Sequence, residues 1–495
     1  MGEKKQNVSV VGGGIAGIAV AIRTALKGYP TALYESNPYL GGKIAEVRGG
    51  GFRFDAGPSL FTMPHLIDEL FELAGKNPRD YFDYEQLPII TKYFYEDETV
   101  INAYSNAQKF ALELSYKTQT PTEDTMNFLE DCKQRYELTE DVFLNKPINI
   151  GGSFLSGSGL KSIFGMGKLK AFTTMHDENA KRFKNEKVVQ LFDRYATYNG
   201  SNPFKAPATL NLIAHLEHNL GAFLAVGGMY SIVNALEKLL YEVGVTVHKN
   251  SPVSEIIVSN YQVKGVNSNG FGHLSNIVIS NLDVAVTYKN LLRKADMPIM
   301  RVGGGKEKST SAIIFYWGIK GKFKHLDVHN ILFGKSYEKE FKYLFDYKGV
   351  YHDPTVYIYI SSKNNALDAP EDHENWFTMI NVPHNKGQDW DKIIEEAREN
   401  ILDKIERTLK IDIRSHIVFE EILDPRTIES RTGSYLGALY GDSSNDKLAA
   451  FGRHPNHSDQ VRGLYFCGGS VHPGGGIPLC LKSAKIVADL LPNSK

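Results

Sequence analysis

The sequence predicts a mixed α/β fold that contains a strand–helix–strand unit near its start. A short apolar strand at residues 8–11 runs directly into three glycines, an amphipathic helix follows, and a second strand ends at Glu35. A helix and several short strands follow Gly227, and a strand, a glycine-rich loop and a helix form the last 33 residues, 463–495. With 495 residues the chain is too long for one compact core, so we expect several units.

The composition argues against several classes of protein. The 56 basic and 57 acidic side chains nearly balance, so we expect no nucleic-acid partner. The cysteines Cys132, Cys467 and Cys480 are far apart and form no CxxC pair, so we expect neither a disulfide framework nor a metal site. We also expect no signal peptide, no spanning helix and a cytoplasmic location.

The first unit, residues 8–35, has the spacing of a dinucleotide site. Gly12 allows a tight turn, Gly14 lets the backbone approach a pyrophosphate, and Gly17 lets the helix pack closely on the strand. Glu35 is placed to bond a ribose diol, and an acid there disfavours NADP. The alternative is a glycine-rich turn that binds no ligand. The residues expected to contact the dinucleotide are Gly12, Gly14, Ile15, Ala16, Gly17, Glu35 and Ser36.

The loop after Glu35 favours FAD over NAD. Gly41 and Gly42 follow in the arrangement E-x5-GG-[RK], which resembles the signature of glutathione-reductase-like FAD flavoproteins. Lys43 stands where those proteins usually carry Arg. The lysine keeps a positive charge that can hold a phosphate, but it cannot make the two parallel hydrogen bonds of a guanidinium. The glycine-rich stretches 151–159 and 301–308 lack flanking strand and helix patterns, so we expect loops there. Without a second nucleotide loop, the chain resembles an oxidase or desaturase more than an NADPH-dependent reductase.

Two later segments resemble further pieces of a split FAD domain. Residues 227–244 form an amphipathic helix pattern, and four short strands are expected between 245 and 283. In the C-terminal segment, Pro478 suits the first turn of a helix that ends near Leu491. The dipole of that helix would stabilise negative charge on a reduced flavin, with backbone N–H groups near Ile477 as donors. Val253 would lie near the adenine by resemblance, and a β-meander without a ligand is the alternative.

The stretches "GFRFDAGPSLFTMP" (51–64), "GGMYSIVNALEKLL" (227–240) and "GGSVHPGGGIPLCLKSAK" (468–485) resemble the bacterial-type phytoene desaturase superfamily of carotenoid desaturases. The resemblance implies an FAD-binding Rossmann fold in three pieces, 1–74, 226–295 and 431–495. The interruptions would be a substrate and membrane-associating insertion, 75–225, and a substrate domain, 296–430. The further cofactor contacts that it implies are Gly57, Pro58, Ser59, Leu60, Val253, Asn281, Gly469, Ser470, Gly476, Ile477 and Pro478.

The implied reaction is FAD-dependent desaturation. Residues 52–75 most resemble the hydroxycarotenoid 3,4-desaturases, which implies hydride transfer from an allylic carbon of a 1-hydroxylated carotenoid to the flavin. Phytoene desaturation, a flavin amine or protoporphyrinogen oxidase, and a non-catalytic carotenoid-binding flavoprotein are the alternatives. The candidate catalytic residues are His472, which alternatively only holds its loop, and Glu217, whose role is open.

A polyene substrate requires an apolar slot, and the aromatic segments 195–204 and 311–319 suit one. Residues 159–175 interleave lysines with apolar residues, as a segment lying on a membrane surface does, although a helix packed on its own domain fits equally. We expect peripheral attachment to the cytoplasmic face of a membrane. Oxygen or a quinone is expected as electron acceptor.

Overall fold

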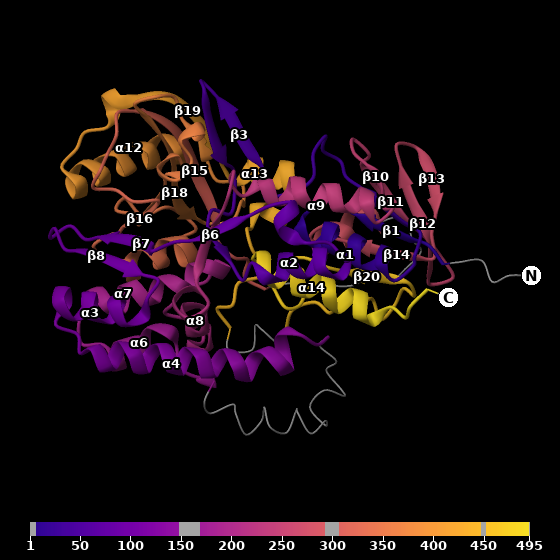
Figure 1. The fold of residues 1–495 in the computed structure, drawn as a ribbon, viewed down its shortest axis with the longest axis horizontal. Coiled ribbons are helices and arrows are strands. Elements are labelled where there is room, and N and C mark those ends of the chain that lie inside the picture. The colour runs from indigo at the N-terminus through magenta and orange to yellow at the C-terminus, as the bar shows by residue number, and fades with distance from the viewer. Residues whose placement is uncertain (1–5, 148–168, 293–305, 447–451, 495) are drawn as a thin grey trace, which may run out of the picture.

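The computed structural model describes residues 6–147, 169–292, 306–446 and 452–494. One half of the molecule is built on a five-stranded parallel sheet (Figure 1). Val8–Val11 is a buried apolar strand, as its β-branched residues predict. The sheet draws its strands from three distant parts of the chain. Their order is β10 (Thr246–His248), β2 (Thr31–Tyr34), β1 (Val8–Val11), β14 (Ile277–Ser280) and β20 (Leu464–Phe466).

Both faces of the parallel sheet are covered. Helices pack one face around a shared apolar core: α1 (Ile15–Leu26), α2 (His65–Leu73), α9 (Tyr230–Glu242) and α14 (Ile477–Leu490). Figure 1 shows α14 beside α1 and α2, although α14 is the last helix of the chain. An antiparallel sheet covers the other face: β11 (Val253–Ser259), β12 (Gln262–Ser268) and β13 (Phe271–Leu274).

A seven-stranded sheet forms the second half of the molecule. Its strands are antiparallel except for the parallel pair β16–β7. The order is β19 (Ile417–Leu423), β15 (Ser311–Lys320), β18 (His373–Val382), β17 (Val356–Tyr359), β16 (His329–Leu332), β7 (Ile89–Phe94) and β8 (Val100–Tyr104). The amphipathic helix α12 (Trp390–Leu409) covers one face, and the opposite face looks toward the parallel-sheet half.

Helices pack against the β7–β8 end of this sheet around an aromatic core: α3 (Ala107–Thr118), α4 (Thr122–Thr139), α6 (Met175–Arg182), α7 (Glu186–Asp193) and α8 (Leu212–His218). Two small sheets join the halves. One is the hairpin of β3 (Glu46–Gly49) and β4 (Phe52–Asp55), and the other contains β5 (Phe61–Thr62), β9 (Ala222–Ala225) and β6 (Tyr84–Gln86). The described residues also contain the shorter helices α10 (Val284–Val286), α11 (Tyr337–Lys342) and α13 (Pro425–Thr432).

The mixed α/β fold expected from the sequence is confirmed, with one correction to its elements. The expected strand at the end of the 245–283 segment is two strands, β13 and β14, because the chain turns between Leu274 and Ile277 and joins a different sheet. The parallel sheet takes its strands from within 1–74, 226–295 and 431–495, and these exact limits stay a prediction.

Some expectations fall on residues that the structure does not describe. The loops expected at 151–159 and 301–305 lie outside the described residues, as does 159–168 of the expected membrane segment. Within the described part of that segment, the side chain of Phe172 is 65% exposed. In the ranges that the structure describes, we find no helix that is both long and apolar enough to cross a bilayer.

Candidate active site

The first glycine loop forms a close-fitting turn between β1 and α1. Gly12 has φ +97°, and a Cβ added at Gly17 would lie 2.0 Å from the Gly12 carbonyl oxygen. Only glycine therefore lets the helix approach the strand here. Glu35, at the end of β2, is buried and accepts a hydrogen bond from the Gly13 N–H at 2.7 Å. This bond fixes the acid beside the N-terminus of α1.

The second glycine pair packs directly against the first loop. The Gly41 N–H donates to the Gly13 carbonyl at 2.8 Å, and both Gly41 and Gly42 have positive φ. Lys43 follows, and its Nζ donates to the carbonyl of Leu439 at 2.5 Å. Burial lowers the pKa of Lys43, opposed by Cys480 and Asp283. The lysine therefore ties this loop to the C-terminal part of the chain.

The third glycine segment meets the first through Asn281. The amide Nδ2 of Asn281 donates to the Cys467 carbonyl at 3.1 Å, and a Cβ at Gly14 would lie 2.7 Å from its Oδ1. α14 begins at Ile477, with Pro478 in its first turn. A Cβ built at Gly476 meets no atom within 4 Å, so open space lies in front of this helix N-terminus. The three segments together form a cradle with room for a ligand.

A cavity of about 1330 Å³ joins this cradle to the seven-stranded sheet. Of the predicted cofactor residues, Gly17 alone does not line it, because Gly17 serves helix packing. The predicted residues that line the cavity are Gly12, Gly14, Ile15, Ala16, Glu35, Ser36, Gly41, Gly42, Lys43, Gly57, Pro58, Ser59, Leu60, Val253, Asn281, Gly469, Ser470, Gly476, Ile477 and Pro478. Their contacts with a cofactor stay a prediction, and their arrangement fits a dinucleotide.

The sequence reasoning missed one wall of the cradle. Residues 430–434 and 438–441 line the cavity, and a Cβ at Gly475 would meet the side chain of Tyr440 at 2.8 Å. The segment "RTGSYLGALYG" (431–441) carries three glycines at the start of the third piece, and these closely spaced glycines were the available signal.

The far part of the cavity is lined by one face of the seven-stranded sheet. Side chains of a strand alternate between its two faces, so every second residue faces the cavity. This wall combines apolar and polar side chains: Ala312 and Ile314 on β15, His329 and Ile331 on β16, Tyr357 on β17, and Phe377, Met379 and Asn381 on β18. The cavity is therefore suited to a long apolar molecule that carries a polar group.

A chain of hydrogen bonds crosses from the cradle to this sheet. The hydroxyls of Ser59 and Tyr357 are 2.6 Å apart, and the Tyr357 hydroxyl lies 2.8 Å from His329 Nδ1. Burial and the charge of Arg194 lower the pKa of His329 to about 3, so the imidazole is neutral. All four residues line the cavity.

Arg194, on the 3₁₀ helix η3 (Arg194–Asn199), is buried at the same wall. It donates to the hydroxyl of Tyr93 at 2.7 Å, to that of Tyr198 at 3.3 Å and to Glu217 Oε2 at 3.4 Å. Glu217 also accepts hydrogen bonds from Tyr195 and Tyr198. Burial raises the pKa of Glu217, opposed by Arg194.

Neither candidate catalytic residue is among the described residues that line the cavity. Glu217 is fully buried and reaches the cavity only through Arg194 and Tyr198. His472 is also fully buried, and its Nε2 lies 2.9 Å from the carbonyl of Lys146. Burial lowers the pKa of His472 to about 4. These contacts suit a residue that holds its loop.

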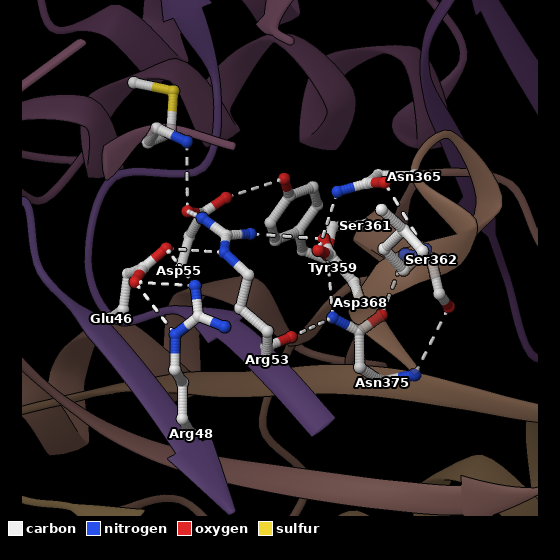
Figure 2. Close-up of polar contacts among 12 residues, drawn as sticks. Glu46, Arg48, Arg53, Asp55, Tyr359, Ser361, Ser362, Asn365, Asp368 and Asn375 are labelled. Atoms are coloured by element: carbon white, nitrogen blue, oxygen red, sulfur yellow. Dashed lines mark hydrogen bonds and ion pairs between the residues drawn. The ribbon is translucent and has the colours of Figure 1, made fainter. Parts of the chain in front are cut away.

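A buried ionic network lies directly before the loop 56–60 in the chain and is shown in Figure 2. Arg53 on β4 donates to Asp55 at 2.6 Å, to Glu46 at 2.6 Å and to Asp368 at 3.1 Å. Asp55 accepts in addition from the hydroxyl of Tyr359 on β17 at 3.0 Å. The network joins the two halves of the molecule next to the residues that enter the cavity.

Comparisons with known proteins agree with this site. Residues 15–299 match the family of flavin-containing amine oxidoreductases. The chain is 45% identical to 1-hydroxycarotenoid 3,4-desaturase of Flavobacterium sp. (strain P99-3), over 98% of this chain and 99% of that one. It is 31% identical to 4,4'-diaponeurosporene oxygenase of Staphylococcus haemolyticus (strain JCSC1435), over 99% and 97% of the two chains.

Among solved structures, cyclohexylamine oxidase from Brevibacterium oxydans IH-35A shares the fold, with a TM-score of 0.61, 13% identity, and 98% of each chain covered. The expected resemblance to carotenoid desaturases is confirmed. The cofactor is FAD, and the glycine cradle, Glu35 and the open space before α14 fit it. The chain belongs to the flavin-containing amine oxidoreductase family, as an FAD-dependent oxidoreductase of the carotenoid desaturase type.

Proposed function

We propose that the enzyme introduces a C=C bond at the 3,4 position of a 1-hydroxylated carotenoid in carotenoid biosynthesis. The observation that carries the proposal is the near-full-length similarity to a 1-hydroxycarotenoid 3,4-desaturase. The cavity supports it, because an apolar sheet face with a few polar side chains suits a polyene with one hydroxyl group.

Bound FAD supplies the hydride acceptor for cleavage of the allylic C–H bond. The protein itself orients the substrate and excludes water from the site. The sheet face that carries Ile314 and Phe377 would hold the polyene beside the cradle. The N-terminus of α14 faces the cavity at Ile477. The helix dipole would therefore favour negative charge on a reduced flavin bound beside it. His472 and Glu217 are the candidates for the handling of the proton, and the hydrogen bonds of Glu217 to Arg194 and Tyr195 favour a positioning role for it instead.

Two bacterial hosts test the proposed reaction, one that accumulates phytoene and one that accumulates a 1-hydroxylated carotenoid. We expect loss of two hydrogens by mass and a red shift in the absorption of the extracted pigment in the second host alone. Coloured products from phytoene would identify a phytoene desaturase instead. No change in either host would contradict carotenoid desaturation and direct the assay to amines and porphyrinogens.

We also propose that the enzyme takes its substrate from a membrane surface, through residues 159–175, on the cytoplasmic side. The support is the apolar substrate class and the exposed Phe172 beside Lys170. The test is co-sedimentation of the holoenzyme with anionic liposomes before and after deletion of 159–172. Unchanged sedimentation of the deletion variant would contradict the role of this segment.

The proposed electron acceptor is oxygen or a quinone. An anaerobic assay distinguishes the two, because quinone-dependent turnover continues without oxygen. Turnover that stops without oxygen and resumes with it, with peroxide released, would identify oxygen. Anaerobic turnover on a soluble quinone would identify the quinone.

A further inference from the structure

Several polar side chains line the cavity between the cradle and the seven-stranded sheet, in a site that holds a polyene. We call this group the polar wall and define it as Ser59, Arg194, Tyr198, His329 and Tyr357. All five residues line the cavity, and they come from four separate parts of the chain. Ser59, Arg194 and His329 are each less than 9% exposed.

Hydrogen bonds within the molecule leave two buried nitrogens of the polar wall unpaired. Nε2 of His329 and Nε of Arg194 have no hydrogen-bond partner among the described residues. A buried polar group without a partner costs about 1–3 kcal/mol. A purely hydrocarbon substrate would leave these nitrogens unpaired, whereas a substrate with a polar group beside them would offset the cost.

A hydroxyl group matches His329 whichever ring nitrogen carries the proton. The imidazole is neutral, and Nδ1 faces the Tyr357 hydroxyl at 2.8 Å. If Nδ1 accepts from Tyr357, Nε2 is a donor; if Nδ1 donates, Nε2 is an acceptor. A hydroxyl can both donate and accept, so it serves either tautomer. An ether oxygen serves one tautomer only, and a hydrocarbon serves neither.

The position of the polar wall also fits the chemistry. In a 1-hydroxycarotenoid the oxygen is three covalent bonds from carbon 3, so a group that binds it must lie beside the bond that is oxidised. Ser59 follows Gly57, where an added Cβ would lie 2.1 Å from the Lys43 carbonyl in the cradle. The Ser59 hydroxyl in turn reaches Tyr357 on the sheet. The polar wall therefore begins where the cradle and the substrate part of the cavity meet.

We propose that the polar wall binds the hydroxyl group at the end of the carotenoid, with His329 as its central hydrogen-bonding residue, and so selects hydroxylated over unmodified polyenes. The inference rests on the proposed function, because it assigns residues to the hydroxyl of that substrate. It predicts that the enzyme discriminates between substrates that differ only at carbon 1.

The test compares three carotenoids with the same chain and a hydroxyl, a methoxy group or a hydrogen at carbon 1. We measure kcat/KM of the holoenzyme and, separately, binding by the absorption shift of the carotenoid. The His329 ring stacks on the rings of Tyr357 and Tyr359. His329→Phe keeps an aromatic ring at this position and removes both ring nitrogens. We expect it to lower the ratio of kcat/KM for the hydroxy substrate to kcat/KM for the hydrogen analogue roughly 10- to 100-fold.

Tyr357→Phe keeps the stacked ring and removes the hydroxyl that orients His329, so we expect a smaller loss in the same direction. His215→Phe is the matched control: this buried histidine contacts the ring of Tyr136 and lies outside the described lining of the cavity. Its selectivity should equal that of the wild type. FAD content and the melting temperature of each variant verify folding.

The outcomes separate the two proposals. Selective loss on the hydroxy substrate in H329F or Y357F supports the inference. Equal kcat/KM of the wild type for all three carotenoids, or equal losses on all three in folded variants, overturns the inference and leaves 3,4-desaturation intact. Failure of the wild type to convert any of the three overturns the proposed function and the inference with it.

Discussion

Nη1 of Arg53 lies 3.1 Å from Oδ2 of Asp368, although the two residues are 315 positions apart in the chain. The same guanidinium pairs with Asp55 at 2.6 Å, and the side chains of both aspartates are 1% exposed. Arg53 is thus the charge that lets two carboxylates remain buried between β4 and the seven-stranded sheet (Figure 2).

Removal of this arginine should be severely destabilising. Arg53→Met leaves Asp55 and Asp368 buried without their cation, and we expect a loss of about 3–5 kcal/mol in the free energy of unfolding. Arg48→Met is the control, since Arg48 pairs with Glu46 from a side chain that is 66% exposed. Exposed pairs contribute about 0–1 kcal/mol. Urea unfolding followed by circular dichroism measures both, and equal losses would contradict the role of Arg53.

The glycine at position 17 should decide whether FAD binds. A Cβ in Gly17→Ala would lie 2.0 Å from the Gly12 carbonyl, so α1 must move away from β1. Overpacking of this kind costs about 1–3 kcal/mol, which corresponds to roughly 5- to 150-fold weaker binding. Flavin content after dialysis and fluorescence titration of the apoprotein measure this. Gly349→Ala, where a Cβ meets no atom within 4 Å, should bind FAD as the wild type does.

The cradle could be predicted from the sequence because its residues belong to short local motifs. Gly12, Gly14 and Glu35 lie within one strand–helix–strand unit, so their spacing alone indicates a shared site. Gly17 shows the limit of such reasoning: it belongs to the motif, yet it packs against Gly12 and does not line the cavity.

The polar wall could not be predicted in the same way. His329 and Tyr357 are on adjacent strands, but neither stands in a recognisable motif, and Arg194 comes from a distant helical segment. Only the pairing of β16 with β17 and the packing of η3 bring these side chains together. Such long-range contacts are set by the whole fold, whereas a sequence pattern records neighbours along the chain. The signal in the sequence was limited to polar residues that interrupt apolar strands.

Acid should destabilise the protein through its buried histidines. Burial lowers the pKa of His384 to about 4 and that of His472 to about 4, from 6.5 in an unfolded chain. Below pH 6.5 the unfolded state binds more protons than the folded state, so stability falls as the pH drops toward 4. Each such histidine contributes a slope of up to about 1.4 kcal/mol per pH unit.

Urea unfolding at pH values from 4 to 7 measures this slope. His384→Gln removes one of the buried groups and should flatten the dependence, while the exposed His65→Gln should leave it unchanged. A slope in H384Q equal to that of the wild type would mean that His384 is protonated in the folded protein. His384 is the better choice for this test because His472 holds a loop next to the cradle.

Glu217 should position Arg194 rather than exchange a proton with the substrate. It lies outside the described cavity lining, and its carboxylate already accepts hydrogen bonds from Arg194, Tyr195 and Tyr198. Glu217→Gln keeps the shape of the side chain and one of the two oxygen acceptors for the tyrosine hydroxyls, so we expect the rate of anaerobic flavin bleaching by substrate to fall less than about tenfold. Loss of a general base would cost about 10²- to 10⁴-fold.

Glu217→Leu completes the test, because it removes every oxygen acceptor at this position and leaves the buried Arg194 and the tyrosine hydroxyls facing a hydrocarbon side chain, which should lower the free energy of unfolding by about 3–5 kcal/mol. Glu340→Gln is the matched control: this buried acid bonds Thr355, its pKa is raised to about 7 by burial, and it is not in the described cavity lining. A loss of 10²-fold or more in E217Q that is absent in E340Q, with unchanged stability, would make Glu217 the base. A small loss of the bleaching rate in E217Q, together with a large loss of stability in E217L, would show that Glu217 holds the polar wall in position.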